Sequence, residues 1–430
     1  MAGTTAHHIL LSTIATASIV QHTASAETSH PIGVEFRPDT IIRSNGFGDG
    51  YFSTWAADDS LIVSVNDGNW LADLEPYNFD PGRWYQSGHS ESYHNNLYRL
   101  TGDAGQFTRD KFGLAYPYSK GNNSWFGFGV ISINGVIYSA ISKTIEVQGW
   151  STPFIGVKLL QSVDSGHSWQ SINSAGASQP VLPESFASWR SDEEDLFFPP
   201  QSGKPHEKRE AYPFSWLSFV QMGRDYSKNK DGYVYIYSTE GAQANNLLLA
   251  RAPKAQLGQR RRWEYFVKFD ESGAPIWSSD LDKRGSIYVF PDRDPQGHRF
   301  GFTSWLPSVI WNEGLGLYIM VNGGTYAGLG MSLSDTDYFY SWPHSESGSL
   351  GLWYSKTPFG PWKQFYYSDH WTADNPKNLI YWPTLSSKWI SSDGKDMVLV
   401  WCDAMKNARG ESHAVNYRWN QMRIHLRVGK

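Results

Sequence analysis

The chain has 430 residues, a formal net charge of −5 and only 18% charged residues, whereas 15% of its residues are aromatic, including 20 Trp. The low charge content excludes a disordered chain, and the mildly acidic balance excludes a nucleic-acid-binding protein. One hydrophobic core rarely serves such a length unless the fold is a closed ring of repeated units. Aromatic rings fill the space between packed sheets, and they also line sugar-binding clefts.

The first element in chain order is a short apolar stretch over residues 9–20, which the small-residue motif Ala24-Ser25-Ala26 follows. This pattern predicts a signal peptide at residues 1–26 and therefore a secreted, extracellular protein. The stretch is too short and too polar to span a bilayer, and no later segment is long and apolar enough, so we expect no membrane partner. Cys402 is the only cysteine, which excludes an intrachain disulfide.

Residues 27–430 contain five copies of one degenerate unit, in which two apolar runs flank a turn and a third run follows. The first two runs of each copy cover residues 53–65, 128–141, 217–237, 308–321 and 385–401. Three of the turns carry Asn-Gly or Asp-Gly, which favour hairpins because both residues tolerate a positive φ. No stretch sustains a 3.6-residue apolar period. The recurrence predicts a single all-β domain, a β-propeller with five blades, or with seven if two pairs have been merged.

Two acids flank the hairpin of the first unit. Asp49 precedes the inner strand, Asp67 ends the strand after the turn, and Trp55, between them, is a candidate residue for shaping the sugar site. The inner strands of a propeller converge on its axis, so we expect both acids on one rim. Glycoside hydrolysis needs one protonated carboxyl group to release the leaving group and one carboxylate to attack carbon or activate water. The alternative is that both acids are turn caps.

Polar residues elsewhere in the chain are candidate sugar ligands. His89, His94 and His370 lie in polar, loop-like sequence, where a histidine can act as a base or bind sugar. Asn96 and Tyr381 are further candidates for substrate binding. None of the histidines has the spacing of a zinc site, so the sequence predicts no metal and no cofactor, while leaving room for a structural calcium ion.

Residues 162–169 fit the Asp-box pattern S-x-D-x-G-x-x-W. In this motif the Asp side chain bonds groups of its own turn, Gly166 takes a positive φ, and Trp169 packs between blades. The motif predicts a propeller and indicates no activity, so we expect Asp164 and His167 to be structural.

The third unit offers a different chemistry. Tyr235 and Tyr237 share one face of a strand, since side chains alternate, and Arg251 ends a neighbouring strand. In a polysaccharide lyase, the Arg would neutralise a uronate carboxylate and a Tyr of lowered pKa would move the proton. Tyr235 and Arg251 are therefore alternative catalytic residues, and Tyr237 is a candidate substrate contact. The other interpretation is that the tyrosines pack between blades and Arg251 forms a structural ion pair.

Several motifs occur in one order along the chain. They are residues 128–138, the Asp box, residues 231–237, residues 249–253 with 263–265, and residues 357–362. The series resembles the five-bladed propeller family that includes the microbial endo-D-arabinanases. In that family the catalytic acids lie at the start of the first blade, in a Thr-Asp-Leu-Gly and a Gly-Asp-Thr element, and Asp49 and Asp67 hold the matching positions. Their neighbours differ, because the chain reads Gly48-Asp49-Gly50 and Asn66-Asp67-Gly68.

Tyr235 and Arg251 also resemble, more weakly, the catalytic pair of propeller polysaccharide lyases such as the ulvan and rhamnosyl-glucuronate lyases. The histidines of those enzymes would be expected on the blade of Tyr138, which has only His167 of the Asp box. A lyase mechanism would then need His89, His94 or a Tyr as its base.

The sequence therefore favours a secreted glycoside hydrolase that cleaves a polysaccharide with Asp49 and Asp67. A lyase acting on a uronate-containing glycan and a non-catalytic sugar-binding propeller are the alternatives. We expect a polysaccharide or oligosaccharide as the partner and a monomeric protein.

Overall fold

The computed structural model describes residue 1 and residues 29–71, 93–117, 125–144, 154–182, 195–199, 212–240, 243–290, 306–324, 348–368, 371–376, 380–403 and 417–429. The predicted signal peptide, His89 and His370 lie outside these residues. Within them the strands form five antiparallel sheets, and the helices are all short 3₁₀ turns. None of the helices in these ranges is long and apolar enough to cross a membrane. The structure confirms an all-β propeller with five blades.

Each blade is one sheet whose strands run from the centre outwards. Blade 1 comprises β3 (Phe47–Trp55), β4 (Leu61–Asn69), β5 (Tyr93–Asp103) and β6 (Gln106–Pro117). Blade 2 comprises β7 (Trp125–Ile133), β8 (Val136–Thr144), β9 (Phe154–Ser162), β10 (Gln170–Ile172) and β11 (Ser178–Pro180). Blade 3 comprises β12 (Ser218–Phe219), β13 (Tyr233–Glu240), β14 (Gln243–Pro253), β15 (Glu264–Phe269) and β16 (Pro275–Ser278), and β17 (Tyr288–Val289) pairs with β14. Blade 4 comprises β18 (Ser308–Asn312), β19 (Leu317–Gly324), β20 (Ser349–Ser355) and β21 (Lys363–Ser368).

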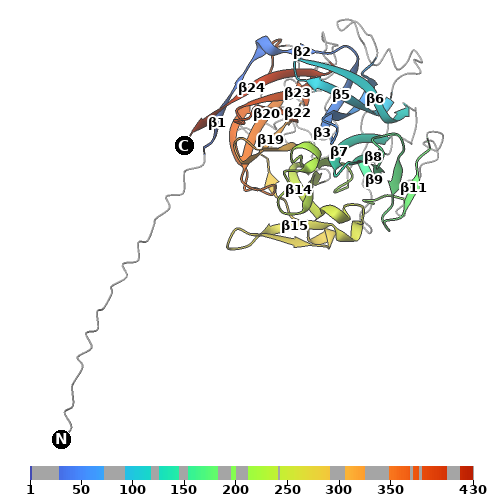
Figure 1. The fold of residues 1–430 in the computed structure, drawn as a ribbon, viewed down its shortest axis with the longest axis vertical. Coiled ribbons are helices and arrows are strands. Elements are labelled where there is room, and N and C mark those ends of the chain that lie inside the picture. The colour runs from blue at the N-terminus through green and yellow to red at the C-terminus, as the bar shows by residue number, and fades with distance from the viewer. Residues whose placement is uncertain are drawn as a thin grey trace, which may run out of the picture.

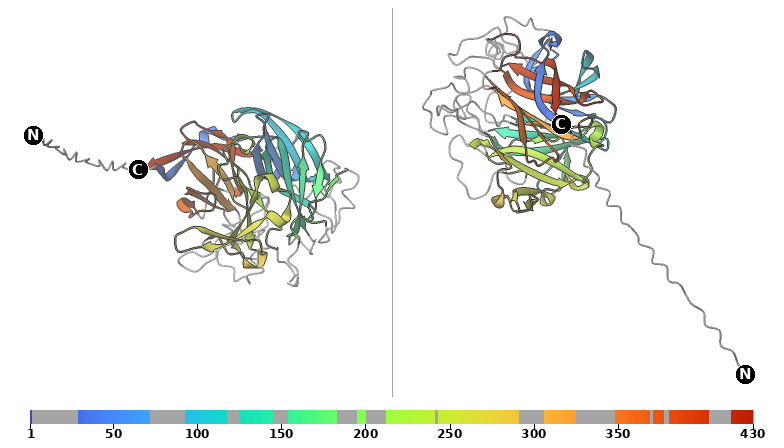
Figure 2. Two further views of the ribbon diagram at one scale, coloured as in Figure 1. Left: turned by 60° about the horizontal axis from the view of Figure 1, so that its bottom comes forward. Right: turned by 90° about the vertical axis from the view of Figure 1, so that its left-hand side faces the viewer.

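Blade 5 closes the ring with strands from both ends of the chain. It comprises β22 (Ile380–Ile390), β23 (Asp396–Asp403), β24 (Asn420–Gly429) and β1 (His30–Phe36), and β2 (Ile42–Arg43) also pairs with β24. Figure 1 shows the blue N-terminal strand beside the red C-terminal strand, and the turned views of Figure 2 show the same pairing. The sequence did not predict β1, because a single edge strand carries no hairpin signal.

The 3₁₀ helices lie in the connections. They are η1 (Pro38–Thr40), η3 (Arg224–Tyr226), η4 (Lys254–Gln256), η5 (Arg260–Arg262) and η6 (Leu281–Lys283).

The inner strands β3, β7, β12, β18 and β22 contact one another around the axis and run in the same direction. Hydrogen bonds join them at equal heights, as between Thr384 Oγ1 and the Tyr51 carbonyl at 3.1 Å, and between Ser132 N and Thr54 Oγ1 at 2.9 Å. We call the rim where the inner strands begin the upper rim, and the rim where they end the lower rim. Because each second strand runs back, β4 ends at the upper rim and β13 begins at the lower rim.

Aromatic rings fill much of the space between blades. Trp70, which follows β4, stacks on Trp419, which precedes β24, with ring centroids 4.8 Å apart. Blades 2 and 5 both adjoin blade 1, and Phe128 of blade 2 stacks across the axis on Trp382 of blade 5, with ring centroids 5.2 Å apart. These rings are buried, so a large share of the aromatic excess serves packing, as the bulk of such rings favours.

The turns between inner strand pairs lie at the lower rim and follow the predicted hairpins. Asn134 and Gly135 have φ values of 52° and 78°, so this Asn-Gly turn adopts the left-handed conformations that these residues tolerate. The Asp box is structural, as expected. Asp164 accepts hydrogen bonds from Ser162 Oγ, Ser168 N and Ser168 Oγ at 2.6–2.9 Å, and Trp169 packs edge-on against Phe112 of blade 1.

A segment of blade 3 at the lower rim, residues 223–229, ties this blade to three others. Arg224 Nε donates to the Ala57 carbonyl of blade 1 at 3.0 Å. Asp225, at φ 52°, accepts from Ser132 Oγ and Gly135 N of blade 2 at 2.7 and 2.9 Å. Lys228 pairs with Glu313 of blade 4 at 2.5 Å. A non-glycine residue keeps a left-handed conformation only where its surroundings enforce it, so these contacts fix the segment.

Candidate active site at the upper rim

The two acids of blade 1 come together at the upper rim. Asp49 lies near the start of β3 and pairs with Asn66 of β4, and Asp67 follows at once with a φ of 45°. Gly50 allows this close approach, because a Cβ there would lie 2.6 Å from Asn66 Nδ2 and its φ is 64°. The glycine after Asp49 thus lets the start of β3 pack closely against the end of β4.

Asp49 is a buried carboxyl group with one strong donor. The residue is 6% exposed, and Tyr417 Oη donates a hydrogen bond of 2.5 Å to its Oδ2. Burial raises the pKa of Asp49 well above its ordinary value, the charge of Asp67 raises it further, and the hydrogen bond from Tyr417 opposes both. Asp49 is thus the carboxyl group of the pair whose surroundings favour the protonated form.

Asp67 is the more exposed acid and lies beside a histidine. Its side chain is 18% exposed, and its Oδ1 lies 3.2 Å from Nδ1 of His94, which β5 positions. The His94 ring packs edge-on against Phe126 of blade 2, with centroids 4.9 Å apart. We expected His94 to bind sugar directly. With only 4% of the residue exposed, the structure instead makes it a partner of Asp67.

An amide network lies under the acids and fixes blade 1 to blade 2. Asn66 Nδ2 donates to the Gly127 carbonyl at 2.8 Å, and Gly127 N donates to Asn66 Oδ1 at 2.9 Å. Asn95 Nδ2 donates to Asn66 Oδ1 and to Ser64 Oγ at 3.0 and 2.8 Å. Neither Asn66 nor Asn95 was predicted as a site residue, although the polar run in two adjoining strands was a visible signal.

Three further residues at this rim differ in what they can contact. Tyr381 lies near the start of β22, at the upper rim, and burial and then the charge of Asp49 raise its pKa. Cys402 of β23 is buried beside it and donates to the Tyr381 carbonyl at 3.3 Å. Asn96 is 1% exposed and donates to Tyr98 Oη at 3.3 Å, so it contributes to packing within blade 1 and does not face a substrate.

The structure does not bring Tyr235 and Arg251 to the acids. They are cross-strand neighbours, as expected, but they lie near the start of β13 and the end of β14, at the lower rim. Tyr235 Oη donates to Asp231 Oδ2 at 2.6 Å, and burial followed by that carboxylate raises the pKa of Tyr235. A lyase would need the opposite shift in a tyrosine that moves a proton.

The Arg251 side chain is likewise occupied. Its guanidinium pairs with Glu264 at 2.9 Å and lies 4.1 Å from the ring centroids of both Tyr233 and Trp277. Tyr237, expected to contact substrate, is fully buried between blades 3 and 4, donates to the Pro358 carbonyl at 2.5 Å and accepts from Trp362 Nε1. Both residues form structural contacts, which was the alternative interpretation of this unit.

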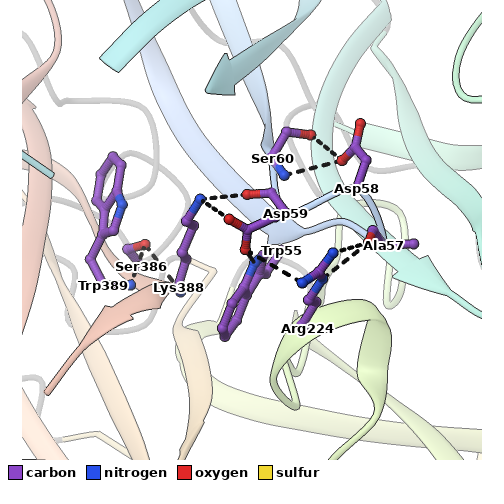
Figure 3. A network of polar contacts seen from close by, with 9 residues as sticks. All are labelled: Trp55, Ala57, Asp58, Asp59, Ser60, Arg224, Ser386, Lys388 and Trp389. Atoms are coloured by element: carbon purple, nitrogen blue, oxygen red, sulfur yellow. Dashed lines mark hydrogen bonds and ion pairs between the residues drawn. The ribbon is translucent and has the colours of Figure 1, made fainter. Parts of the chain in front are cut away.

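Trp55 also lies at the lower rim, at the end of β3. Six residues of extended strand separate it from Asp49, which corresponds to about 20 Å. Figure 3 shows its indole nitrogen donating to Asp59, at 2.8 Å, and Lys388 reaching the same carboxylate at 3.1 Å. This placement differs from the expectation that Trp55 shapes the sugar site.

Metal ligation gains no support from the described residues, among which no three His, Cys, Asp or Glu side chains are grouped to hold an ion. The arrangement that the upper rim does offer is a buried carboxyl group with a raised pKa next to a second, more exposed carboxyl group. That is the pairing that acid–base cleavage of a glycosidic bond requires.

The chain is similar to known proteins in structure only. No protein-family model matches the sequence, and no curated protein is significantly similar to it. A candidate hydrolase from Bacteroides ovatus is similar in structure at 15% identity, with a TM-score of 0.47 over 89% of this chain and 87% of that one.

Two sugar-active enzymes are also similar in structure. An α-L-arabinofuranosidase from Podospora anserina, solved with cellotriose, has 9% identity and a TM-score of 0.40 over 92% and 96% of the two chains. A xylan β-1,4-xylosidase from Bacillus halodurans has 8% identity and a TM-score of 0.39 over 89% and 53%.

Proposed function

We propose that this protein is a glycoside hydrolase that cleaves a polysaccharide with Asp49 and Asp67 as its two carboxyl groups. The observation that carries the proposal is the contrast between neighbours: Asp49 is buried and its pKa is raised, while Asp67 is more exposed and adjoins His94. Pairs of acids whose surroundings separate their protonation states are typical of glycosidase sites.

The roles follow from the surroundings of each acid. Asp49 is the general acid: it gives its proton to the glycosidic oxygen while the bond from that oxygen to the anomeric carbon breaks. Asp67 is the charged partner, which attacks the anomeric carbon or activates the water that does so. His94 holds Asp67 in place through the contact at 3.2 Å. Tyr381 is the aromatic side chain best placed to line the sugar site.

The substrate class is a polymer outside the cell. The signal-peptide pattern at residues 1–26 supports export, and a secreted enzyme meets polysaccharides that cannot enter a cell. Expression in a secreting host tests this part separately: the mature protein should accumulate in the medium with its N-terminus close to residue 27, and a protein retained whole in the cytoplasm would contradict it.

A screen of neutral and acidic polysaccharides tests the reaction. A hydrolase releases reducing ends without new absorbance, whereas a lyase creates an unsaturated uronate that absorbs near roughly 235 nm. We expect reducing ends alone, and their loss in Asp49→Asn and Asp67→Asn. Absorbance at that wavelength would support the lyase alternative, and binding without any product would support the sugar-binding alternative.

A further inference from the structure

Tyr417 reaches the proposed general acid from the far end of the chain. It is separated from Asp49 by 368 residues and lies just before β24, in blade 5. Two contacts fix it against the start of β3: its carbonyl accepts from Gly48 N at 3.2 Å, and its hydroxyl donates to Asp49 Oδ2 at 2.5 Å. The residue is 3% exposed, so water does not compete freely for this hydroxyl.

The two contacts act on adjacent residues. Gly48 N donates a hydrogen bond to the backbone carbonyl of Tyr417, and the next residue, Asp49, accepts one from the hydroxyl of the same tyrosine. A carboxyl group held at one oxygen by a fixed donor has its rotamer set, and only its second oxygen remains to meet a substrate. Positioning of this kind contributes to a rate because it places the proton donor before the reaction begins.

We infer that Tyr417 is a positioning residue that holds Oδ2 of Asp49 and leaves Oδ1 to face the glycosidic oxygen. The inference rests on the proposed function. In the cleavage step the proton leaves Oδ1 for the glycosidic oxygen, and the electron pair of the breaking C–O bond stays on that oxygen. The leaving sugar departs as an alcohol, and the new carboxylate of Asp49 keeps the hydrogen bond from Tyr417, which retains its own proton.

Burial and two neighbouring side chains set the pKa of Asp49. Asp67 of β4 raises its pKa by repulsion, and Tyr417 lowers it by hydrogen bonding. Burial raises the pKa of Tyr51 of β3, Tyr381 of β22 and Cys402 of β23, and the charge of Asp49 raises it further. Tyr417 is the member of this set that donates a hydrogen bond to the carboxylate itself.

Tyr417→Phe removes the hydroxyl and keeps the ring. The alkaline limb of kcat/KM should move to higher pH by about one unit, because a hydrogen bond to a charged group stabilises the ionised form by that order. The limb reports Asp49, since a general acid must be protonated in the free enzyme. We also expect kcat to fall roughly tenfold from lost orientation, with KM nearly unchanged.

Tyr51→Phe is the matched control. Tyr51 is equally buried, two residues from Asp49 on the same strand, and packs against Trp70 and Trp419. Within the described part of the chain its hydroxyl has no hydrogen-bond partner. Its loss should leave the pH profile and kcat where they are. A shift as large as that of Tyr417→Phe would show that buried hydroxyls act here through packing alone, and would overturn the inference.

A second variant keeps the test open if Tyr417→Phe does not fold. Replacing Tyr417 with 3-fluorotyrosine retains shape and hydrogen bond while making the hydroxyl a stronger donor, so the alkaline limb should move to lower pH, the opposite direction. An unmoved limb in either folded variant contradicts the inference. If the alkaline limb does not move but Asp49→Asn and Asp67→Asn abolish turnover, only the role of Tyr417 is wrong. If Asp49→Asn and Asp67→Asn both keep turnover, the proposed function itself is wrong.

Discussion

The two rims of this propeller hold their carboxyl groups in opposite ways. At the upper rim, burial and the charge of Asp67 raise the pKa of Asp49. At the lower rim, hydrogen bonds from Ser168 lower the pKa of Asp164 to about 2, and the hydrogen bond from Trp55 lowers that of Asp59. An ionised carboxylate with several donors favours folding, whereas a buried, repelled one opposes it.

The same strand shows both behaviours. β3 begins beside Asp49 and ends at Trp55, whose partner Asp59 belongs to the next turn. Acids in the lower-rim turns, such as Asp59 and Asp164, accept several hydrogen bonds and so serve stability. The carboxyl pair that departs from this rule, without an evident gain in stability, is the one to which we assign chemistry.

The largest expected effect is at the upper rim. Asp49→Asn and Asp67→Asn should each lower kcat by roughly 10³-fold, within the range that general acid–base groups contribute. Reducing-end assays on the best substrate of the screen measure it, with circular dichroism to confirm folding. Asp164→Asn, an equally conservative change at the lower rim, is the control and should stay within about twofold of the parent. An equal loss of kcat in Asp164→Asn would show that the acids of the two rims do not differ in their role.

The next effect is on stability at the lower rim. Asp225→Ala removes the acceptor of Ser132 Oγ and Gly135 N and places alanine at a φ of 52°, so we expect a loss of about 2–3 kcal/mol in the free energy of unfolding. Asp225→Asn keeps an acceptor and tolerates this conformation, so its loss should be smaller. Denaturant melts measure both. Activity per folded molecule should not change. A loss of activity would show that this contact at the lower rim affects the site at the upper rim.

Asp49→Asn should also stabilise the protein in a pH-dependent way. The folded state raises the pKa of Asp49 above the ordinary value of 3.8. Above that pH the carboxyl group ionises more readily in the unfolded chain than in the folded protein, so it opposes folding. The stability it costs grows with pH up to its folded pKa, by about 1.4 kcal/mol per unit. The variant should therefore match the parent near pH 3 and unfold at higher temperature near pH 7. An unchanged difference across this range would contradict the raised pKa.

The smallest effect is expected for the tyrosine of the lyase alternative. Tyr235→Phe should leave turnover within about twofold and cost about 1 kcal/mol of stability, from the lost hydrogen bond to Asp231. Steady-state assays and thermal melts measure the two quantities. Loss of turnover in a folded Tyr235→Phe protein would move the chemistry to the lower rim.

The sequence predicted the scaffold well because its signals are local. Hairpin turns, alternating apolar runs and the Asp box each depend on neighbouring residues, and all five units match strand pairs of the structure. The first strand was placed too late, at Ser53, whereas β3 begins at Phe47. Gly48 and Gly50 interrupt the apolar pattern there, which hides the first half of the strand that Trp55 ends.

The site was predicted only in part, for a related reason. Asp49 and Asp67 flank one hairpin, which makes their proximity visible in the sequence. Tyr417 contacts Asp49 only because β1 and β24 close the ring, and no local pattern specifies that contact. Tyr235 and Arg251 were expected on neighbouring strands, and they are cross-strand neighbours. Their rim could not be predicted, since strand direction depends on where each inner strand begins.

The most direct test of the central claim is a double-variant cycle on Asp49 and Asp67, read as reducing ends released from the preferred polysaccharide. Two acids that act in one step should behave as a unit, so Asp49→Asn/Asp67→Asn should lose no more than the worse single variant, roughly 10³-fold. Losses that multiply to about 10⁶-fold, or single variants that keep near-normal turnover, would show that the upper-rim acids do not form one catalytic pair.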